Sequence, residues 1–406
     1  MQTGKHFLQI PGPTNVPDSV LRAISNPTID HRGPEFSEMT SDLLEGVKKV
    51  VKGNKSIPII FPSSGTGAWE SALVNILSDN DKILMYDTGH FSTLWKNMAE
   101  KLGFEVIYVE SEWRTGVDSD KFIEILKNDQ KHEIKAVCMV HNETSTGVTS
   151  KIPSVINEIK SINHPAIIMV DTISSLGSID YYHDDWNVDV TVAGSQKGLM
   201  LPPGIAFNFI SQNALDISIQ NDYKRSYWDW SEMVKTNLNG FFPYTPSTNI
   251  LFGLKEALRL IEEEGLDNIF KRHERHAKAT RAAVNGWGIE LLPMNDDEHS
   301  NSLTSLLFKE NVNADNLFQF ALMGYSYLSI IDPKRDPKIG IIDPSVALVN
   351  KFNNSFLITK NHCCESIYHD NIRFFVTAKS EEFSKKVKYW LKFNKEITLV
   401  NLRSND

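Results

Sequence analysis

The sequence predicts an α/β fold, with a large domain built on a mostly parallel β-sheet covered by helices on both faces, followed by a smaller α+β domain. Between residues 56 and 210, short apolar runs alternate with amphipathic stretches, which is the pattern of a layered α/β domain. Near residue 248 this pattern gives way to two long helical segments. The chain has 406 residues, more than one hydrophobic core usually supports, so we expect two domains.

Several of the predicted strands are apolar on both faces, as expected where helices cover both sides of a sheet. The strands are Ile57–Phe61, Ile83–Tyr86, Val106–Val109, Ala136–His141, Ala166–Val170, Val190–Ala193 and Ile205–Ile210. The helices between them are Ala68–Leu77, Leu94–Leu102, Asp120–Lys127 and Ile152–Lys160. In such sheets ligands bind outside the carboxyl ends of the strands. The residues that follow each strand are therefore the candidates for a site.

The chain divides into an N-terminal arm (1–40), a large domain (41–260) and a small domain (261–406). The arm is rich in proline and glycine, and we expect it to be irregular. Gly265, a helix-ending residue, separates the helices Thr248–Glu264 and Leu266–Val284. Further on we expect a strand at Ser302–Phe308 and helices at Ala314–Leu322 and Ser380–Phe393.

Composition excludes several classes of protein. The net charge of −9 argues against nucleic-acid binding, which needs a basic face. Three cysteines are too few for a disulfide framework and fit a reducing compartment. No leader-like segment opens the sequence, and no apolar run approaches the ~20 residues that span a bilayer. We expect a cytoplasmic protein that does not bind membranes.

The loop Ser63–Gly67 follows the first strand and precedes a helix. Its small residues let backbone N–H groups approach an anion, and the helix start adds a positive dipole. The loop lacks the lysine of a P-loop and the glycine spacing of a dinucleotide fingerprint, so a single phosphate is the best candidate. The alternative is a strand–helix turn in which a serine caps the helix.

Asp171 ends the apolar run Ile167–Val170. A carboxylate in that position is costly to bury unless it meets a cation or several hydrogen-bond donors. It could pair with a protonated ring nitrogen. Alternatively, it could cap the following turn through Thr172 or Ser174.

Lys197 lies between Gly194 and Gly198, just after another apolar strand. Burial beside apolar walls or cations lowers the pKa of a lysine, and the neutral amine is a nucleophile toward aldehydes. The alternative is a surface lysine whose stem packs on the protein while its ammonium stays in water.

Together these features form a set: an anion loop, a strand-end aspartate, and a strand-end lysine 26 positions later. Pyridoxal phosphate (PLP) needs all three, as phosphate cradle, pyridinium partner and Schiff-base lysine. The combination predicts a PLP enzyme whose site contains no metal ion.

The chain also resembles the fold-type I PLP aminotransferases of class V, and within them the serine/alanine/aspartate–glyoxylate group. The resemblance covers roughly residues 5–325. It is carried by six stretches, namely Pro11–Pro17, Asp30–Phe36, Phe61–Glu70, His141–Val148, Gly194–Gly198 and Phe242–Pro246.

This resemblance implies a role for each matching residue. Ser64, Gly65, Thr66 and Gln196 would hold the phosphate. Phe91 would stack on the pyridine ring, and Thr144 would bond near the ring hydroxyl. Thr245, together with Tyr244, would reach the phosphate of the partner subunit, which implies a homodimer with shared active sites. Taken alone, Phe91 could be a core residue, Thr144 or Gln196 a turn residue, and Phe242–Pro246 a packing loop.

One departure from the family concerns the substrate carboxylate. The family places an arginine in a short strand of the small domain, in a Phe-Arg-Ile-Gly-His-like run, and no such run occurs here. The sequence leaves the family pattern over about residues 331–370. Arg373, in Asn371–Phe375, is the nearest replacement, and Arg32 in the arm is another. Arg373 could instead be a surface residue of an edge strand.

The predicted activity is transfer of an amino group from serine, aspartate or alanine to glyoxylate or a similar 2-oxo acid. Lys197 would carry the cofactor and move the Cα proton, while Asp171 keeps the ring nitrogen protonated. Two alternatives remain open. One is a lyase or desulfurase of the same fold, with Cys363 or Cys364 as catalytic cysteine. The other is a homologue that binds PLP without turnover.

Overall fold

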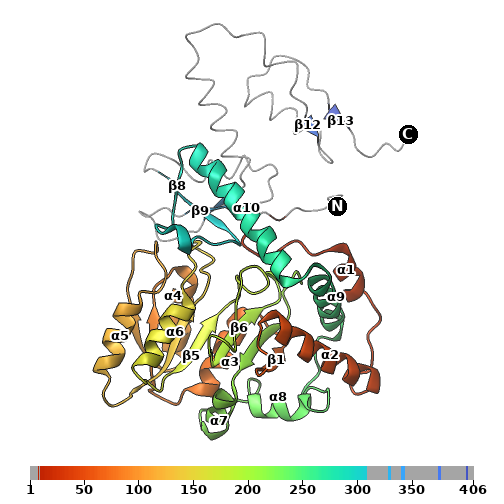
Figure 1. The fold of residues 1–406 in the computed structure, drawn as a ribbon. Helices are drawn as coiled ribbons and strands as arrows, with labels where there is room; N and C mark the ends of the chain where they lie inside the picture. The colour runs from red at the N-terminus through yellow and green to blue at the C-terminus, as the bar shows by residue number, and fades with distance from the viewer. Residues whose placement is uncertain are drawn as a thin grey trace.

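The computed structural model describes residue 8, residues 10–308 and, beyond them, the backbone of four short strands at 328–330, 340–342, 374–375 and 399–400. Its main element is a seven-stranded sheet in the order β1-β7-β6-β5-β4-β2-β3 (Figure 1). The strands are β1 (Ile57–Phe61), β2 (Lys82–Tyr86), β3 (Glu105–Val109), β4 (Ile134–Val140), β5 (Ile167–Asp171), β6 (Val190–Gly194) and β7 (Ala206–Ile210).

All pairings in this sheet are parallel except those of β7, which runs antiparallel to both β1 and β6. Because β7 reverses direction between them, β1 and β6 point the same way. The carboxyl ends of β1, β2, β4, β5 and β6 therefore meet at one edge of the sheet.

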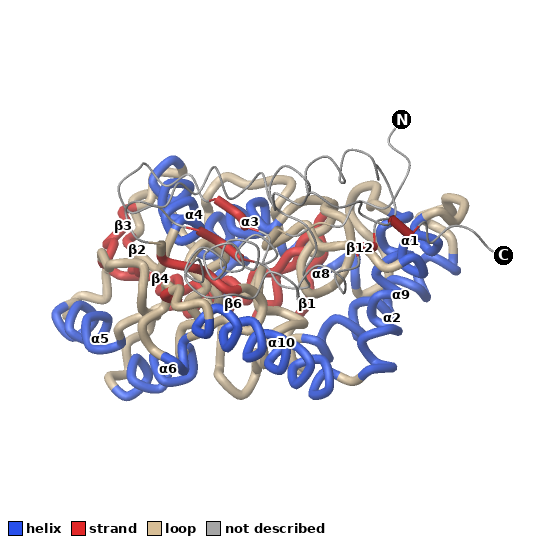
Figure 2. Tube along the Cα trace, turned by 90° about the horizontal axis from the view of Figure 1, so that it is seen from above, coloured by secondary structure: helices blue, strands red, loops and turns tan. Residues whose placement is uncertain are grey.

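Helices cover both faces of the sheet because successive strand residues point to opposite sides and both sets are apolar. Ile60 and Leu84 face a core formed with α2 (Pro34–Val50), α5 (Ser119–Asn128), α6 (Ile152–Ser161) and α9 (Thr248–Glu264). Ile59 and Ile83 face a second core formed with α3 (Gly65–Ile76), α4 (His90–Lys101), α7 (Gln212–Gln220) and α8 (Trp230–Asn237). Viewed from above, the strands run between α3 and α4 on one side and α5 and α6 on the other (Figure 2). The predicted fold class is confirmed.

The expectation of an irregular arm over residues 1–40 was wrong in two places. Helix α1 spans Asp18–Ile24, and α2 begins at Pro34 and continues past residue 40. Proline caused the error, because Pro17 and Pro34 are not helix breakers here. They occupy the N-cap of α1 and the first turn of α2, where the missing N–H of proline costs no hydrogen bond.

The long helices α9 and α10 (Leu266–Gly286) meet at Gly265, whose φ of +81° favours glycine. Beyond them lie a short 3₁₀ turn, Asp296–Glu298, and a four-stranded sheet in the order β11-β10-β9-β8. Its strands are β8 (Glu290–Leu291), β9 (Thr304–Leu307), β10 (Leu328–Ile330) and β11 (Gly340–Ile342); β12 (Phe374–Phe375) pairs with β13 (Leu399–Val400). The helices predicted at 314–322 and 380–393 lie outside the described residues. The proposed domain boundary at residue 260 falls inside α9.

No helix in the described part of the chain has the length and apolar character needed to cross a membrane.

Candidate active site

Asp171 is the last residue of β5, and its carboxylate is buried at the edge where the parallel strands end. The indole Nε1 of Trp69 donates to Oδ2 over 2.9 Å, and the backbone N–H of Ile173 donates to Oδ1 over 2.6 Å. Burial raises the pKa of Asp171 to about 7, although these two donors oppose the shift. The carboxylate does cap the following turn, through Ile173 rather than Thr172 or Ser174.

Lys197 follows β6, the strand beside β5. Its side chain is half-buried, and Nζ donates to the carbonyl oxygen of Pro11. Burial lowers the pKa of Lys197 to about 8, against the attraction of Asp171 and Glu143. The geometry does not fit a surface lysine that extends into water.

The N-terminal segment crosses directly over this lysine, a contact that sequence reasoning missed. Thr14 Oγ1 donates to the Lys197 carbonyl oxygen over 3.2 Å, and the Thr14 N–H donates to that of Gln196 over 3.0 Å. Gly12 has a φ of +108°, and a Cβ atom there would lie 2.7 Å from Lys197 Nζ. Sequence reasoning had singled out the stretch Pro11–Pro17 because it matches the family. Nothing in that stretch, however, indicates that it contacts Lys197.

The anion loop leads into α3, and Ser64 occupies the N-cap position. Its side chain makes no capping hydrogen bond, so the loop is not a simple serine cap. A Cβ atom at Gly194 would lie 2.9 Å from Gln196 Oε1 and 3.5 Å from the backbone nitrogen of Gly65. The Gln196 amide and the start of α3 therefore face the same point.

That arrangement fits a phosphate. Gln196 Oε1 is buried and has no hydrogen-bond partner among the described residues. A side-chain amide can turn its NH₂ group toward an acceptor, and a helix start attracts negative charge. The exposed hydroxyls of Ser64 and Thr66 lie in the same loop.

Phe91 lies in the first turn of α4, which follows β2, and Thr144 lies in the loop after β4. The ring centroid of Phe91 lies 6.0 Å from Lys197 Nζ, so the ring reaches the site although it also packs on the core. Thr144 is buried beside Glu143. Both positions agree with the predicted roles, which stay predictions.

Glu143 is a buried carboxylate that sequence reasoning did not single out. It accepts hydrogen bonds from the backbone N–H groups of Phe91, Ser92 and Ser145, and from the Ser145 hydroxyl. It thus fastens the start of α4, which carries Phe91, to the loop that carries Thr144. Burial raises the pKa of Glu143, although these donors oppose the shift.

Of the remaining predicted residues, the three that the structure describes make no hydrogen bond or ring contact with Lys197. Tyr244 stacks on Tyr227 with ring centroids 4.6 Å apart, and Thr245 is exposed. Arg32 is exposed just before α2. Arg373 lies outside the described residues.

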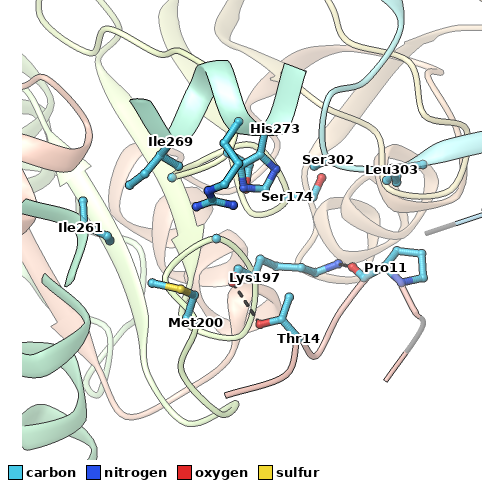
Figure 3. Close-up of a pocket in the computed structure, with 14 residues that line it drawn as sticks. Pro11, Thr14, Ser174, Lys197, Met200, Ile261, Ile269, His273, Ser302 and Leu303 are labelled. Carbon is cyan, nitrogen blue, oxygen red and sulfur yellow. Dashed lines mark hydrogen bonds between the residues drawn. The ribbon is translucent and has the colours of Figure 1, made fainter. Parts of the chain in front are cut away.

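A cavity of about 200 Å³ opens beside Lys197. Figure 3 shows Lys197 and Thr14 on one side of it and His273 and Ile269 of α10 on the other. Arg272 also lines it, but its guanidinium is paired with Glu264 through contacts of 2.6 and 3.0 Å.

Cys138 lies inside β4, where burial raises the pKa of its thiol. It is therefore not an activated nucleophile. Cys363 and Cys364, the cysteines of the desulfurase alternative, lie outside the described residues.

A family model described as aminotransferase class-V matches residues 6–321 of the chain. The chain belongs to the class V aminotransferases. This confirms both the predicted family and the predicted class of enzyme. The family uses PLP, which the residues around Asp171 and Lys197 fit.

Two relatives within this family illustrate the similarity. The chain is 45% identical over 328 residues to a serine–glyoxylate aminotransferase of Methylorubrum extorquens, an alignment that covers 80% of this chain and 82% of the relative. It is 42% identical over 323 residues to an L-aspartate–glyoxylate aminotransferase of Paracoccus denitrificans, with coverage of 80% and 82%.

The fold is shared with solved aminotransferase structures. An alanine–glyoxylate aminotransferase of Nostoc superposes with a TM-score of 0.78 at 23% identity, covering 88% of this chain and 96% of the other. Another match, with a TM-score of 0.74 at 24% identity, is the ureidoglycine–glyoxylate aminotransferase of Bacillus subtilis, with coverage of 90% and 96%.

Proposed function

We propose that this class V aminotransferase uses PLP to move an amino group from a small L-amino acid (serine, aspartate or alanine) to glyoxylate or a similar 2-oxo acid. The observation that carries the proposal is the placement of Asp171 and Lys197 at the ends of neighbouring parallel strands. The glyoxylate aminotransferases among the relatives support the choice of acceptor.

The cofactor would be held at both ends. Ser64, Gly65, Thr66 and Gln196 would bind its phosphate, and Asp171 would pair with its ring nitrogen. Phe91 would pack on the ring, and Thr144 would bond near the ring hydroxyl. When bound, PLP supplies an aldehyde that captures the amino group and a ring that accepts electrons.

The two titratable residues have separate tasks. Lys197 can attack the cofactor's aldehyde only as a neutral amine. A pKa of about 8 makes that form accessible near neutral pH. Its Nζ is then the group that removes the proton from the substrate Cα. Asp171 supplies the negative charge that a protonated ring nitrogen requires.

The proposed assembly is a homodimer, in which Thr245 and Tyr244 reach the phosphate bound by the other subunit. We propose Arg373, with Arg32 as the second candidate, for the substrate carboxylate, because the guanidinium fork binds carboxylates through two hydrogen bonds. The low cysteine content supports a cytoplasmic location.

One experiment tests cofactor chemistry and substrate class together. Borohydride reduction of the PLP-loaded protein followed by peptide mapping is expected to attach the cofactor to Lys197, and Lys197→Ala to abolish the label. Serine, aspartate and alanine are then offered with glyoxylate or pyruvate while cofactor absorbance is followed. Label on another lysine, or no donor that converts the cofactor to its amine form, would contradict the proposal.

A further inference from the structure

The Asp171 carboxylate receives a hydrogen bond from an unexpected side chain, the indole of Trp69. Trp69 Nε1 lies 2.9 Å from Oδ2, and both residues are buried, with 2% and 4% of their surface exposed. Oδ1 is held by the Ile173 backbone. Trp69 is therefore the side-chain donor that the described residues offer to this carboxylate.

The helix that carries Trp69 also forms part of the proposed phosphate site. It lies in α3, the helix whose first residues, Gly65 and Thr66, belong to the anion loop. One helix therefore supplies contacts at both proposed ends of the cofactor, the phosphate through its N-terminus and the ring nitrogen through Asp171. Any shift of α3 would change both ends together.

An alternative is that Trp69 is simply a core residue, and its neighbour Trp95 allows the two roles to be separated. The two rings are stacked, with centroids 5.9 Å apart and 12° between their planes, and both belong to the same core. The Trp95 Nε1 atom, however, is buried without a hydrogen-bond partner in the described structure. Of the stacked pair, Trp69 is the one whose N–H binds the site.

We infer that Trp69 is a positioning residue that fixes the orientation of Asp171 and favours the anionic form of its carboxylate for the cofactor's ring nitrogen. The inference rests on the proposed function, because it assigns Trp69 a role only if PLP binds at Asp171. A hydrogen bond from an uncharged donor stabilises the ionised carboxylate relative to the protonated acid. Without it, Asp171 retains its backbone donor in a setting that favours the neutral form.

Other groups around Asp171 act in both directions. Glu143 and Tyr181 lie close enough to interact with its charge, and Lys197 attracts it from the neighbouring strand end. The buried His141, whose pKa burial lowers to about 4, is neutral near pH 7, and its backbone N–H bonds the main-chain oxygen of Asp171 rather than the carboxylate. Because the hydrogen bond from Trp69 lowers the pKa of Asp171, we expect its removal to raise that pKa further.

The test compares Trp69→Phe with Trp95→Phe in the full-length protein. Each variant keeps an aromatic ring in the stack and removes one indole, but Trp69→Phe alone removes a donor from Asp171. We expect Trp69→Phe to raise the PLP dissociation constant about ten- to a hundredfold, measured by equilibrium dialysis and absorbance. We expect Trp95→Phe to change it less than about threefold, because this large-to-small core substitution costs packing energy but removes no donor from Asp171.

The pH dependence of PLP affinity distinguishes a specific effect on the Asp171 carboxylate from a general loss of packing in the core. Because Asp171 is protonated up to a higher pH in Trp69→Phe, the affinity defect should be largest at acid pH and shrink as pH rises. A defect that is equal at all pH values, or one shared by Trp95→Phe, would overturn the inference. In an Asp171→Asn background, Trp69→Phe should behave like Trp95→Phe.

If Trp69→Phe does not fold, NMR of the tryptophan indoles can test the inference without a substitution at Trp69. With indole ¹⁵N labelling, Trp95→Phe identifies the Trp95 resonance by its loss. Another buried indole resonance should then titrate with pH and shift when PLP is added; if none does, the inference fails. If the parent protein takes up no PLP at Lys197, the proposed function fails instead, whichever tryptophan is changed.

Discussion

Gly12 lies so close to the Lys197 side chain that a Cβ atom at position 12 would sit 2.5 Å from Cε and 2.7 Å from Nζ. The backbone at Gly12, with a φ of +108°, is also strained for any other residue. A residue near the N-terminus therefore limits the space available to a lysine that lies 185 positions later in the chain.

Gly12→Ala should consequently displace Lys197 and reduce covalent PLP incorporation, because core atoms cannot overlap without a shift of one side chain or the other. Borohydride labelling at saturating PLP measures this. Gly103→Ala is the matched control, since Gly103 also has a positive φ, +90°, but nothing lies within 4 Å of its Cβ position. Equal labelling of the two variants would show that backbone strain alone accounts for the effect.

The rate of PLP attachment should rise with pH, reach half of its maximum near pH 8 and level off above about pH 9. With a pKa of about 8, Lys197 has about a tenth of its amine neutral at pH 7, whereas an ordinary lysine has well under a thousandth. Asp171, with a pKa of about 7 in the cofactor-free protein, becomes anionic over the same range. Both changes favour binding, and stopped-flow absorbance measures the profile. A rate that keeps rising beyond pH 10 would mean that Lys197 is not perturbed.

Glu143→Gln should weaken both the fold and cofactor retention. Whichever way the amide is turned, its NH₂ group faces at least one backbone N–H, so a buried donor is left unpaired at a cost of about 1–3 kcal/mol. Urea unfolding and PLP dialysis measure the two effects. Glu298→Gln is the control, because Glu298 is also buried and bonded to a backbone N–H, that of Gly116, but does not bond to α4. It should lower stability without releasing PLP.

If Thr245 binds the phosphate held by the partner subunit, as proposed, PLP binding and dimerisation are linked equilibria. Thr245→Val should then weaken PLP retention and make the dimer easier to dissociate once cofactor is removed. Analytical ultracentrifugation with and without PLP measures the assembly. Thr245→Ser retains the hydroxyl and should retain the coupling. An active monomer at high dilution would rule out the shared site.

Arg373→Ala should raise the Michaelis constants for both amino acid and keto acid while PLP stays bound. Loss of a charge-assisted hydrogen-bond pair, about 1.5–3 kcal/mol, corresponds to roughly ten- to more than a hundredfold in kcat/KM. Arg373→Lys should recover only part of this, since an ammonium lacks the fork. If Arg373→Ala matches the parent with every carboxylate substrate, Arg32 is the next residue to change.

The sequence was most informative where one local pattern decides the structure. Apolar runs predicted all seven strands of the large sheet, and the bounds of β1 and α9 match the predicted ranges. Asp171 and Lys197 were found because each follows such a run. Prolines were misleading because proline breaks a helix in its interior but is favoured in its first turn. Pro34 lies in the first turn of α2.

Contacts between distant parts of the chain could not be predicted in this way. Trp69 reaches Asp171 across 102 positions, Phe91 reaches Glu143 across 52, and Pro11 reaches Lys197 across 186. Neither the periodicity of apolar residues nor the spacing of motifs indicates which distant residues are in contact. They are set by the order of the strands, which places loops together that the sequence keeps apart.

The order of the sheet also has a consequence for biosynthesis. Strand β1 lies at one edge and pairs with β7 alone in the seven-stranded sheet, so Ile57–Phe61 has no strand neighbour until Ala206–Ile210 has been made. A chain emerging from the ribosome must therefore carry the loop Ser63–Gly67 on an unpaired apolar strand for about 150 residues of synthesis. This early-translated part of the site is therefore among the last to be completed, and chaperones would have most reason to act during that interval.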